Sequence, residues 1–187
     1  YTMSGSHFQS QFVSNSAHYE AITPFCPSSQ EDILPYLKLL INKNISLIQP
    51  QRMSLTQSLI PYVSIMPLSS LIECTWCLGT LHFHHDDLHT KDIVITVLDR
   101  IENESNTTLS DVSMSMYFIG MSRMKMKAPD LEPERLCSIL TLVVQDLGAQ
   151  ALSNIIWAMS QMHFNWNILP PQLQNSLLEQ IERLSVS

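Results

Sequence analysis

Two apolar stripes at helical spacing, joined by a connection with two prolines, occupy residues 149–184 and constrain the fold more than any other part of the sequence. Their apolar residues recur at steps of three and four, which places each stripe on one side of a helix. Pro170 and Pro171 suit the first turn of the second helix, where a missing N–H leaves no hydrogen bond unmade. Neither helix can bury its stripe alone, so the stretch predicts a helix pair packed against other helices. The stripes are Leu152, Ile155, Ile156, Met159 and Met162, then Leu173, Leu177, Leu178, Ile181 and Leu184.

Three further helix pairs are predicted upstream. Ser29 and Ser110 precede apolar runs and suit the caps at helix starts, whereas Gly148 suits the C-terminal cap of the helix before it. Ile93, Val94 and Ile95 would also suit a strand, but the spacing after Val94 and the length of the run favour a helix. The predicted helices cover 33–41 and 53–63, then 71–81 and 93–101, then 112–121 and 136–144.

A step of about 40 residues relates the four pairs. Tyr36, Trp76, Tyr117 and Trp157 are separated by 40, 41 and 40 residues and are predicted to be equivalent positions in the first helices. In the last three pairs a small residue follows three positions later, as Gly79, Gly120 and Ser160. A helix pair repeated at this step is typical of an α-solenoid. We therefore expect an all-α solenoid of about four helix-turn-helix repeats, at 29–67, 68–107, 108–147 and 148–187, preceded by an irregular N-terminal extension over residues 1–28.

Composition limits the classes of partner. Charged residues make up 14% of the chain, below the roughly 25% of an ordinary soluble domain, so a largely neutral surface is expected, which suits cover by a partner. The net charge of −7 argues against attraction of nucleic-acid phosphates to the whole surface, although a local basic strip stays compatible with it. Four cysteines are too few for a disulfide framework and favour a reducing or organelle-interior compartment. The chain has no run of 18 apolar residues, so no transmembrane helix and no membrane partner are expected.

The best-preserved repeat resembles a known family. Residues 152–162 read LSNIIWAMSQM and are similar to the L-A-N-x-L-W-A-L-A-x-L first helix of octotricopeptide-type repeats. Pro170, Pro171 and the residues after them resemble the proline-led start of the second helix of these repeats. Related repeats occur in the organelle RNA-binding proteins of the FAST kinase and RAP-domain group. The resemblance implies RNA binding in an organelle, with the mitochondrial matrix as the expected location, or a structural role on ribosomal RNA.

Four of the ten basic residues lie within 13 positions of the third connection. Arg123, Lys125, Lys127 and Arg135 form the one stretch of sequence that could gather phosphates, although they could equally belong to an exposed loop that balances nearby acids. Ser153 and Asn154 stand where a repeat protein of this type would contact single-stranded bases, as do Glu73, Ser113 and Ser115 in other units; an ordinary exposed face is the alternative. The repeated aromatic residues are expected to pack between repeats rather than to stack on bases.

Cys74, Cys77 and the histidine-rich stretch 82–89 contain residue types that bind zinc. However, both cysteines fall within a predicted helix, and the four residues between Cys77 and His82 are too few for a zinc finger. The pattern therefore favours ordinary helix cysteines followed by a solvated histidine loop, and no metal site is predicted.

Sequence motifs for catalysis are missing as well. The chain has four glycines, no glycine-rich phosphate loop, no nucleophile elbow and no H-E-x-x-H motif, so we expect no enzyme and no cofactor. The expected function is that of a non-catalytic, RNA-associated structural subunit of a mitochondrial ribonucleoprotein, in particular the mitochondrial ribosome. Its partners would be ribosomal RNA and neighbouring subunits. The alternatives are a free organelle RNA-binding protein that acts in transcript processing or stability, and a helical scaffold that binds only proteins.

Overall fold

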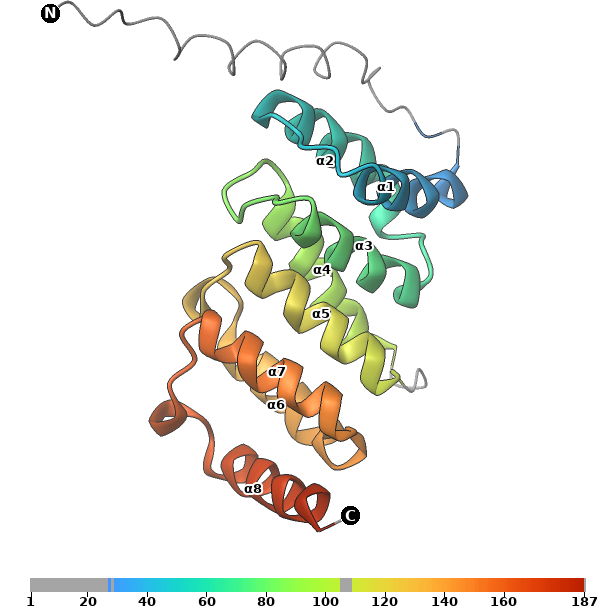
Figure 1. The fold of residues 1–187 in the computed structure, drawn as a ribbon. Coiled ribbons are helices and arrows are strands. Elements are labelled where there is room, and N and C mark those ends of the chain that lie inside the picture. Colours follow the sequence, from blue (N-terminus) through green and yellow to red (C-terminus); the bar gives the residue numbers. More distant parts are fainter. Residues whose placement is uncertain (1–26, 28, 105–108, 187) are drawn as a thin grey trace, which may run out of the picture.

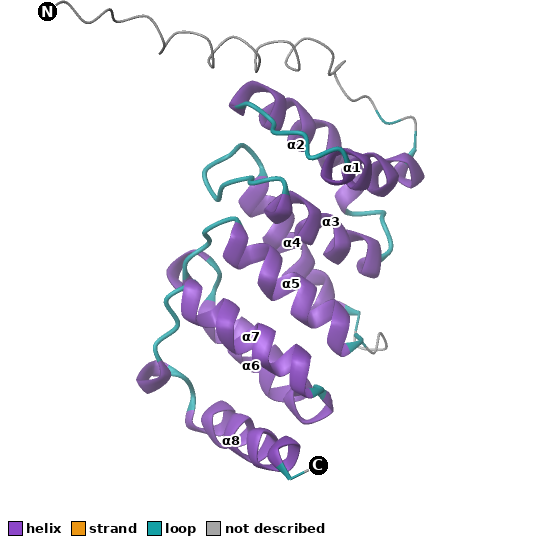
Figure 2. Cartoon of the chain, viewed as in Figure 1, coloured by secondary structure: helices purple, strands orange, loops and turns teal. Residues whose placement is uncertain are grey.

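The computed structural model describes residue 27, residues 29–104 and residues 109–186, so the predicted extension lies almost wholly outside the described residues. Within this part the chain is all helix, with no strand, which confirms the predicted all-α class (Figure 2). Eight α-helices follow one another in pairs: α1 (Ile33–Asn42), α2 (Gln49–Val63), α3 (Leu68–Thr80), α4 (Thr90–Asn103), α5 (Asp111–Arg123), α6 (Pro133–Val143), α7 (Ala149–Gln161) and α8 (Pro171–Ser185). Short 3-10 turns lie at Gln30–Asp32, Ala128–Asp130, Val144–Asp146 and Trp166–Ile168.

Alternate helices pack on one another. The first helices of the pairs form one row, α1 on α3, α3 on α5 and α5 on α7, and the second helices form another, α2 on α4, α4 on α6 and α6 on α8. Figure 1 shows the pairs succeeding one another from the blue end of the chain to the red end. The apolar stripes of both rows are buried in one continuous core, because each stripe meets helices of the neighbouring pairs.

The segment that could have been a strand is helix α4. Ile93, Val94, Val97 and Leu98 are buried, and their spacing is that of one helical face. Ile95 and Thr96, between the two buried pairs, are half-exposed. The β-branched side chains therefore follow the helical period, which confirms that spacing and length outweigh β-propensity here.

Two of the predicted helix caps, both serines, are confirmed, and the predicted glycine cap is wrong. The N–H of Ser113 donates to the Ser110 hydroxyl at 3.1 Å, and the N–H of Ser29 donates to Asp32 Oδ2 at 3.0 Å, so both serines begin helical segments as predicted. Gly148 is not the C-terminal cap of α6: it is the N-cap of α7, with φ −72° and ψ 164°. The chain leaves α6 through the 3-10 turn Val144–Asp146, and this turn takes the place of the predicted glycine cap.

The first helices all end in the same motif. Asn44, His82, Lys125 and His163 each have φ between 51° and 63° and follow the last turn of α1, α3, α5 and α7. In α3, the N–H of Phe83 donates to the Leu78 carbonyl at 3.1 Å and that of His82 donates to the Gly79 carbonyl at 3.2 Å, which is the Schellman pattern. The other three helices make the equivalent pairs of bonds. These ends are fixed points that define which residues of the repeats are equivalent.

The equivalence of the four aromatic residues was wrong. The left-handed residues are separated by 38, 43 and 38 residues rather than by 40, 41 and 40. Counted back from these ends, Tyr36 and Tyr117 share one position, whereas Trp76 and Trp157 share another, two residues further along the helix. The second unit, α3 and α4 with their connections, is longer than the third, and this extra length compensated for the shift and produced an apparently constant step. In the corrected register, Met124 takes the apolar place at which the sequence comparison had found only Ser122.

Glycine lets α3 and α5 approach closely. A Cβ added to Gly79 would lie 2.6 Å from the Gly120 carbonyl oxygen, and one added to Gly120 would lie 2.8 Å from the Thr75 carbonyl oxygen. Gly79 and Gly120 are therefore not equivalent repeat positions, as the sequence suggested, but two sides of one contact. A methyl group at either position would collide with backbone, which cannot move without separating the helices.

Candidate functional site

Three basic residues are exposed at the end of α5 and in the turn that follows it. Met124, Met126 and Ala128 are buried, and the residues that alternate with them, Arg123, Lys125 and Lys127, are exposed. The Schellman turn at Lys125 reverses the chain, and the N–H of Ala128 then donates to the Met162 carbonyl at 2.9 Å. The turn is thereby held against the end of α7, with its cations facing outward. We call Arg123, Lys125 and Lys127 the basic edge.

The basic edge differs from most of the other basic residues, because five of those seven form ion pairs. Ion pairs with carboxylates engage Lys38, Arg52, Lys91, Arg100 and Arg135. Within the described part of the chain, no carboxylate lies at ion-pair distance from Arg123, Lys125 or Lys127. Arg123 Nη1 donates instead to Thr80 Oγ1 at 2.7 Å, and its guanidinium lies 5.9 Å from the centroid of the Trp76 ring, within the range of a cation–π contact.

Arg135 has different surroundings. It lies on α6 and forms ion pairs with Asp99 at 2.8 Å, Glu102 at 2.5 Å and Glu132 at 2.6 Å. Hydrogen bonding to these carboxylates raises the pKa of Arg135, and its hydrogen bonds lower the pKa of Glu102. Because three carboxylates compensate one guanidinium, this predicted phosphate contact carries no excess positive charge, and its evident role is to join α6 to α4.

The polar positions predicted to face bases are only partly open. Ser153 is exposed, and Asn154 is half-buried and accepts a hydrogen bond from Gln150 at 3.1 Å. Glu73 pairs with Lys38 at 2.6 Å. Ser115 is buried, and its hydroxyl donates to the Val112 carbonyl at 3.0 Å. Ser113 is half-buried, and its hydroxyl lies 2.9 Å from that of Ser110. Ser153 is therefore the most open of these positions.

The aromatic residues separate into buried and exposed positions. Tyr117 is buried, and its hydroxyl donates to the Val94 carbonyl at 2.9 Å, while burial raises the pKa of the phenol. Trp157 is 49% exposed, so the expectation that it packs between repeats was wrong. No further helix pair packs on α7 beyond it among the described residues, and the ring consequently faces outward.

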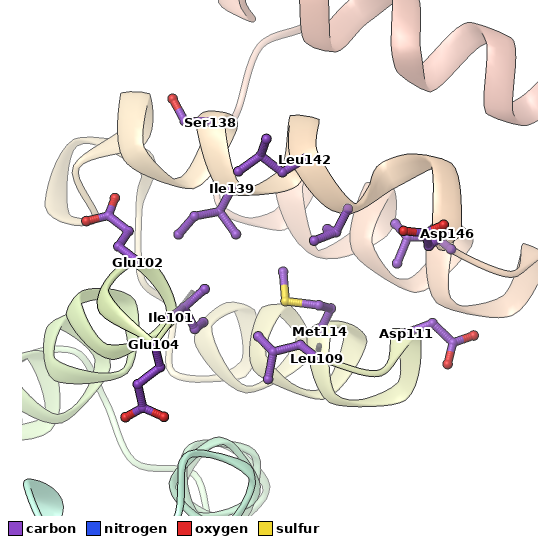
Figure 3. Close-up of a pocket in the computed structure, with 12 residues that line it drawn as sticks. Ile101, Glu102, Glu104, Leu109, Asp111, Met114, Ser138, Ile139, Leu142 and Asp146 are labelled. Carbon is purple, nitrogen blue, oxygen red and sulfur yellow. The ribbon is translucent and has the colours of Figure 1, made fainter. Parts of the chain in front are cut away.

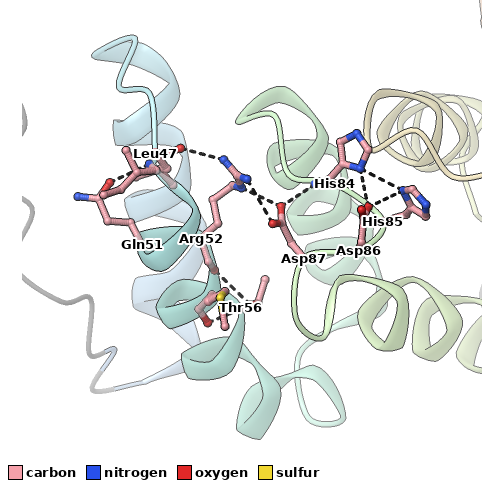
Figure 4. Close-up of polar contacts among 10 residues, drawn as sticks. Leu47, Gln51, Arg52, Thr56, His84, His85, Asp86 and Asp87 are labelled. Atoms are coloured by element: carbon pink, nitrogen blue, oxygen red, sulfur yellow. Dashed lines mark hydrogen bonds and ion pairs between the residues drawn. The ribbon is translucent and has the colours of Figure 1, made fainter. Parts of the chain in front are cut away.

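The histidine connection between α3 and α4 is anchored at several points (Figure 4). Arg52 reaches from α2 and pairs with Asp87, whose side chain is 4% exposed, through Nε at 2.7 Å. Asp87 Oδ2 also accepts the N–H of His84 at 2.7 Å. On the other side, the N–H of His85 donates to the Met124 carbonyl at 2.9 Å, and Phe83 is fully buried beneath the loop. The loop is thus held between α2 and the end of α5, while His82, Asp86 and Leu88 are exposed to solvent as expected.

Three side chains of this loop converge. His84 Nδ1 lies 2.6 Å from Asp86 Oδ1, His85 Nδ1 lies 2.8 Å from the same oxygen, and the two ring nitrogens are 3.1 Å apart. The sequence placed these residues in one loop but predicted no metal site there. Cys74 and Cys77 are buried in α3, which confirms the prediction of ordinary helix cysteines, and burial raises the pKa of both thiols, to about 12 for Cys77.

A cavity of about 490 Å³ lies between α4, α5 and α6. Figure 3 shows apolar side chains such as Met114 and Ile139 at its centre and the carboxylates of Glu102, Glu104, Asp111 and Asp146 around it. An acidic rim repels phosphates, so this cavity does not extend the basic edge.

Comparisons with protein-family models, with curated proteins and with solved structures find no match to this chain. Among the described residues, no helix combines the length and the apolar character needed to cross a membrane.

Proposed function

We propose that the four helix pairs form an α-solenoid and that the protein is a non-catalytic, RNA-associated structural subunit of a mitochondrial ribonucleoprotein, with the mitochondrial ribosome as the assembly to test first. The resemblance of residues 152–162 to octotricopeptide-type repeats supports the class of partner. The packing of alternate helices in two rows supports the solenoid, because each pair then contacts only its neighbours along the chain.

One observation carries the RNA contact: the basic edge is exposed and has no carboxylate partner among the described residues. In a chain of net charge −7, cations that do not compensate internal acids are available to phosphates. The Schellman turns satisfy the last carbonyls of the first helices, yet the helix dipoles still place partial negative charge at this edge. Phosphate attraction there consequently depends on the lysine and arginine side chains themselves.

Mutation of the edge tests the RNA contact. We expect the double variant Lys125→Gln/Lys127→Gln to weaken binding of single-stranded RNA. The slope of the logarithm of the binding constant against the logarithm of salt concentration should become shallower by about 0.7 per lysine. Lys43→Gln is the matched control, since Lys43 is an exposed lysine at the end of α1. Arg135→Gln should change RNA affinity less than the double variant, because carboxylates already hold Arg135. Equal binding by the wild type and the double variant would remove the basic edge from the proposal.

The assembly is tested by purifying the native protein from its source. Co-migration with ribosomal RNA and ribosomal proteins would support the subunit. Recovery as an RNA-bound protein outside the ribosome would favour a free transcript-binding protein. A second candidate function, a protein-binding scaffold, is favoured by the exposed apolar side chains at the α7–α8 end, which include Ile156, Trp157 and Ile168. Recovery in an RNA-free protein complex would favour that candidate.

A further inference from the structure

We infer that His84, His85 and Asp86 bind a divalent transition-metal ion of the Zn²⁺ class, at an open site on the α3–α4 loop. The inference is independent of RNA binding and uses none of the residues of the basic edge. Among the described residues, these three form the one group of histidine, cysteine or acidic side chains whose potential ligand atoms all come together.

The donor geometry is that of one face of a coordination shell. The three atoms lie 2.6, 2.8 and 3.1 Å from one another. With zinc–ligand bonds of about 2.0–2.2 Å, ligand atoms of a tetrahedral or octahedral site are separated by about 2.8–3.6 Å. An ion seated above the triangle therefore contacts all three donors after shifts of a few tenths of an ångström. Two imidazoles and one carboxylate are ligands that suit zinc and other first-row transition ions.

Hydrogen bonding alone satisfies this group poorly. Both Nδ1 atoms point at the same oxygen, Asp86 Oδ1, and also approach each other. If both nitrogens carry hydrogens, the two N–H groups crowd at one acceptor; if one does not, its lone pair faces the carboxylate oxygen. A cation between the three atoms removes this conflict. By contrast, His89 Nδ1 has a simple pairing with Asp92 at 3.0 Å in the same connection.

The loop beneath the triad is held in place before any ion binds. Asp87 is fixed by Arg52 and accepts the His84 N–H (Figure 4). The His85 N–H donates to the carbonyl of Met124, at the end of α5. Such second contacts orient metal ligands and reduce the entropy lost on binding. The C-terminal ends of α3 and α5 also adjoin the loop, and their partial negative charge favours a cation.

The site is open to solvent on one side. The side chain of Asp86 is 73% exposed, and those of His84 and His85 are 36% and 32% exposed. Three protein donors leave one or more coordination positions for water or for a donor from a partner, as in zinc sites that are not purely structural.

The test uses the full chain, purified without a histidine tag and treated with a chelator. Titration with Zn²⁺ in a calorimeter should give one strong equivalent, and Co²⁺ should give the visible absorption of a bound ion. We expect His84→Ala, His85→Ala and Asp86→Asn each to weaken binding at least 10-fold. The matched control is His89→Ala, which removes a histidine of the same connection and should leave binding unchanged.

Folding is checked independently of binding. Asp86→Asn changes an exposed side chain and should leave the far-ultraviolet circular dichroism unchanged, so a loss of binding in this variant is not a loss of fold. Excess Zn²⁺ should raise the unfolding temperature of the wild type and of His89→Ala, but not that of the triad variants. The inference would be overturned if the wild type failed to bind one equivalent of Zn²⁺. It would also be overturned if the double variant His84→Ala/His85→Ala still bound Zn²⁺ as the wild type does.

Discussion

One position of the first helices is buried along the row from α1 to α5 but partly exposed in α7, at the end of the row. Counted from the Schellman ends, Leu37, Thr75, Phe118 and Ile156 are equivalent. The first three are almost fully buried, because the next first helix packs on each of them. Ile156 is 38% exposed, and the same end exposes Trp157, Trp166, Ile168, Leu178 and Ile181. Burial at this position therefore depends on whether another unit follows, and not on the residue type.

The largest expected effect compares Leu37 with Ile156. Leu37→Ala and Ile156→Ala remove the same number of carbon atoms, since leucine and isoleucine are isomers. Leu37 is fully buried, so its loss should lower the free energy of unfolding by about 2–5 kcal/mol. The loss at Ile156 should be below about 1.5 kcal/mol, because water already reaches the side chain. Urea denaturation of each variant measures both values, and equal losses would contradict the contrast between interior and end.

A second comparison concerns the glycines. Gly120→Ala places a methyl group against the Thr75 backbone, and we expect a loss of about 1–3 kcal/mol in unfolding free energy. Gly148→Ala is the control: its Cβ would meet only Asp111 Oδ2, at 3.2 Å, and that side chain can move. Thermal unfolding should show a larger decrease for Gly120→Ala than for the control, whose cost should not exceed about 1 kcal/mol and comes from the poorer N-cap that alanine provides. A tolerated Gly120→Ala would mean that α3 and α5 do not meet through backbone.

The residues with positive φ test whether the turn that ends each first helix contributes equally to stability at both places in the row. His82 lies in the interior and His163 at the α7–α8 end, but both occupy the same turn with φ 61° and 63°. Glycine adopts this conformation without the steric penalty of a Cβ, so His82→Gly and His163→Gly should each stabilise the protein by about 1 kcal/mol. Gln161→Gly, within the last turn of α7, should destabilise it by a similar amount. Chemical denaturation with different gains at the two histidines would show that the turn responds to its neighbours.

The smallest expected effect is a change in how the stability of the row formed by α2, α4, α6 and α8 depends on acid pH. Arg135 lowers the pKa of Glu102, so this pair stabilises the folded state above the unfolded pKa of glutamate, about 4.3. The contribution is lost as pH falls through the lower folded pKa. Glu102→Gln should therefore flatten the decline of stability below about pH 4. At the other end, the Gln180 side chain of α8 donates a hydrogen bond to the Leu147 carbonyl, which precedes α7, at 2.5 Å. Both groups are neutral, so Gln180→Leu should leave the decline of stability with falling pH unchanged. Unfolding temperatures measured from pH 2.5 to 7 test both variants.

Much of the fold was predictable because helical periodicity is a local property. The apolar stripes, the serine caps and Pro171 at the first position of α8 depend on residues within one or two turns. The register was not predictable from aromatic spacing, because the second unit is longer and the tyrosine of the third unit lies two residues earlier in its helix. The signal that could have corrected it is the repeated ending in which Leu78-Gly79-Thr80-Leu81-His82-Phe83 parallels Met159-Ser160-Gln161-Met162-His163-Phe164.

The candidate sites were predictable only as residue types. The sequence placed Arg135 with the lysines because they are close along the chain, but α4 supplies the carboxylates that hold it, from 33 and 36 positions away. Likewise, the histidine loop is fixed by Arg52, which is 35 positions from Asp87. The residues next to Arg135 or Asp87 in the sequence do not indicate which distant residues pair with them.

The sequence alone determined that the chain forms helix pairs, because burying one face of an amphipathic helix requires only the right period. Tertiary structure decided which of these residues are available at the surface. Trp157 faces outward because no further pair packs on it among the described residues, and the basic edge keeps its charge because no described carboxylate reaches it. His84, His85 and Asp86 converge because α2 and α5 hold their loop from both sides. Availability depends on neighbours distant in sequence, and only the packed helices bring those neighbours together.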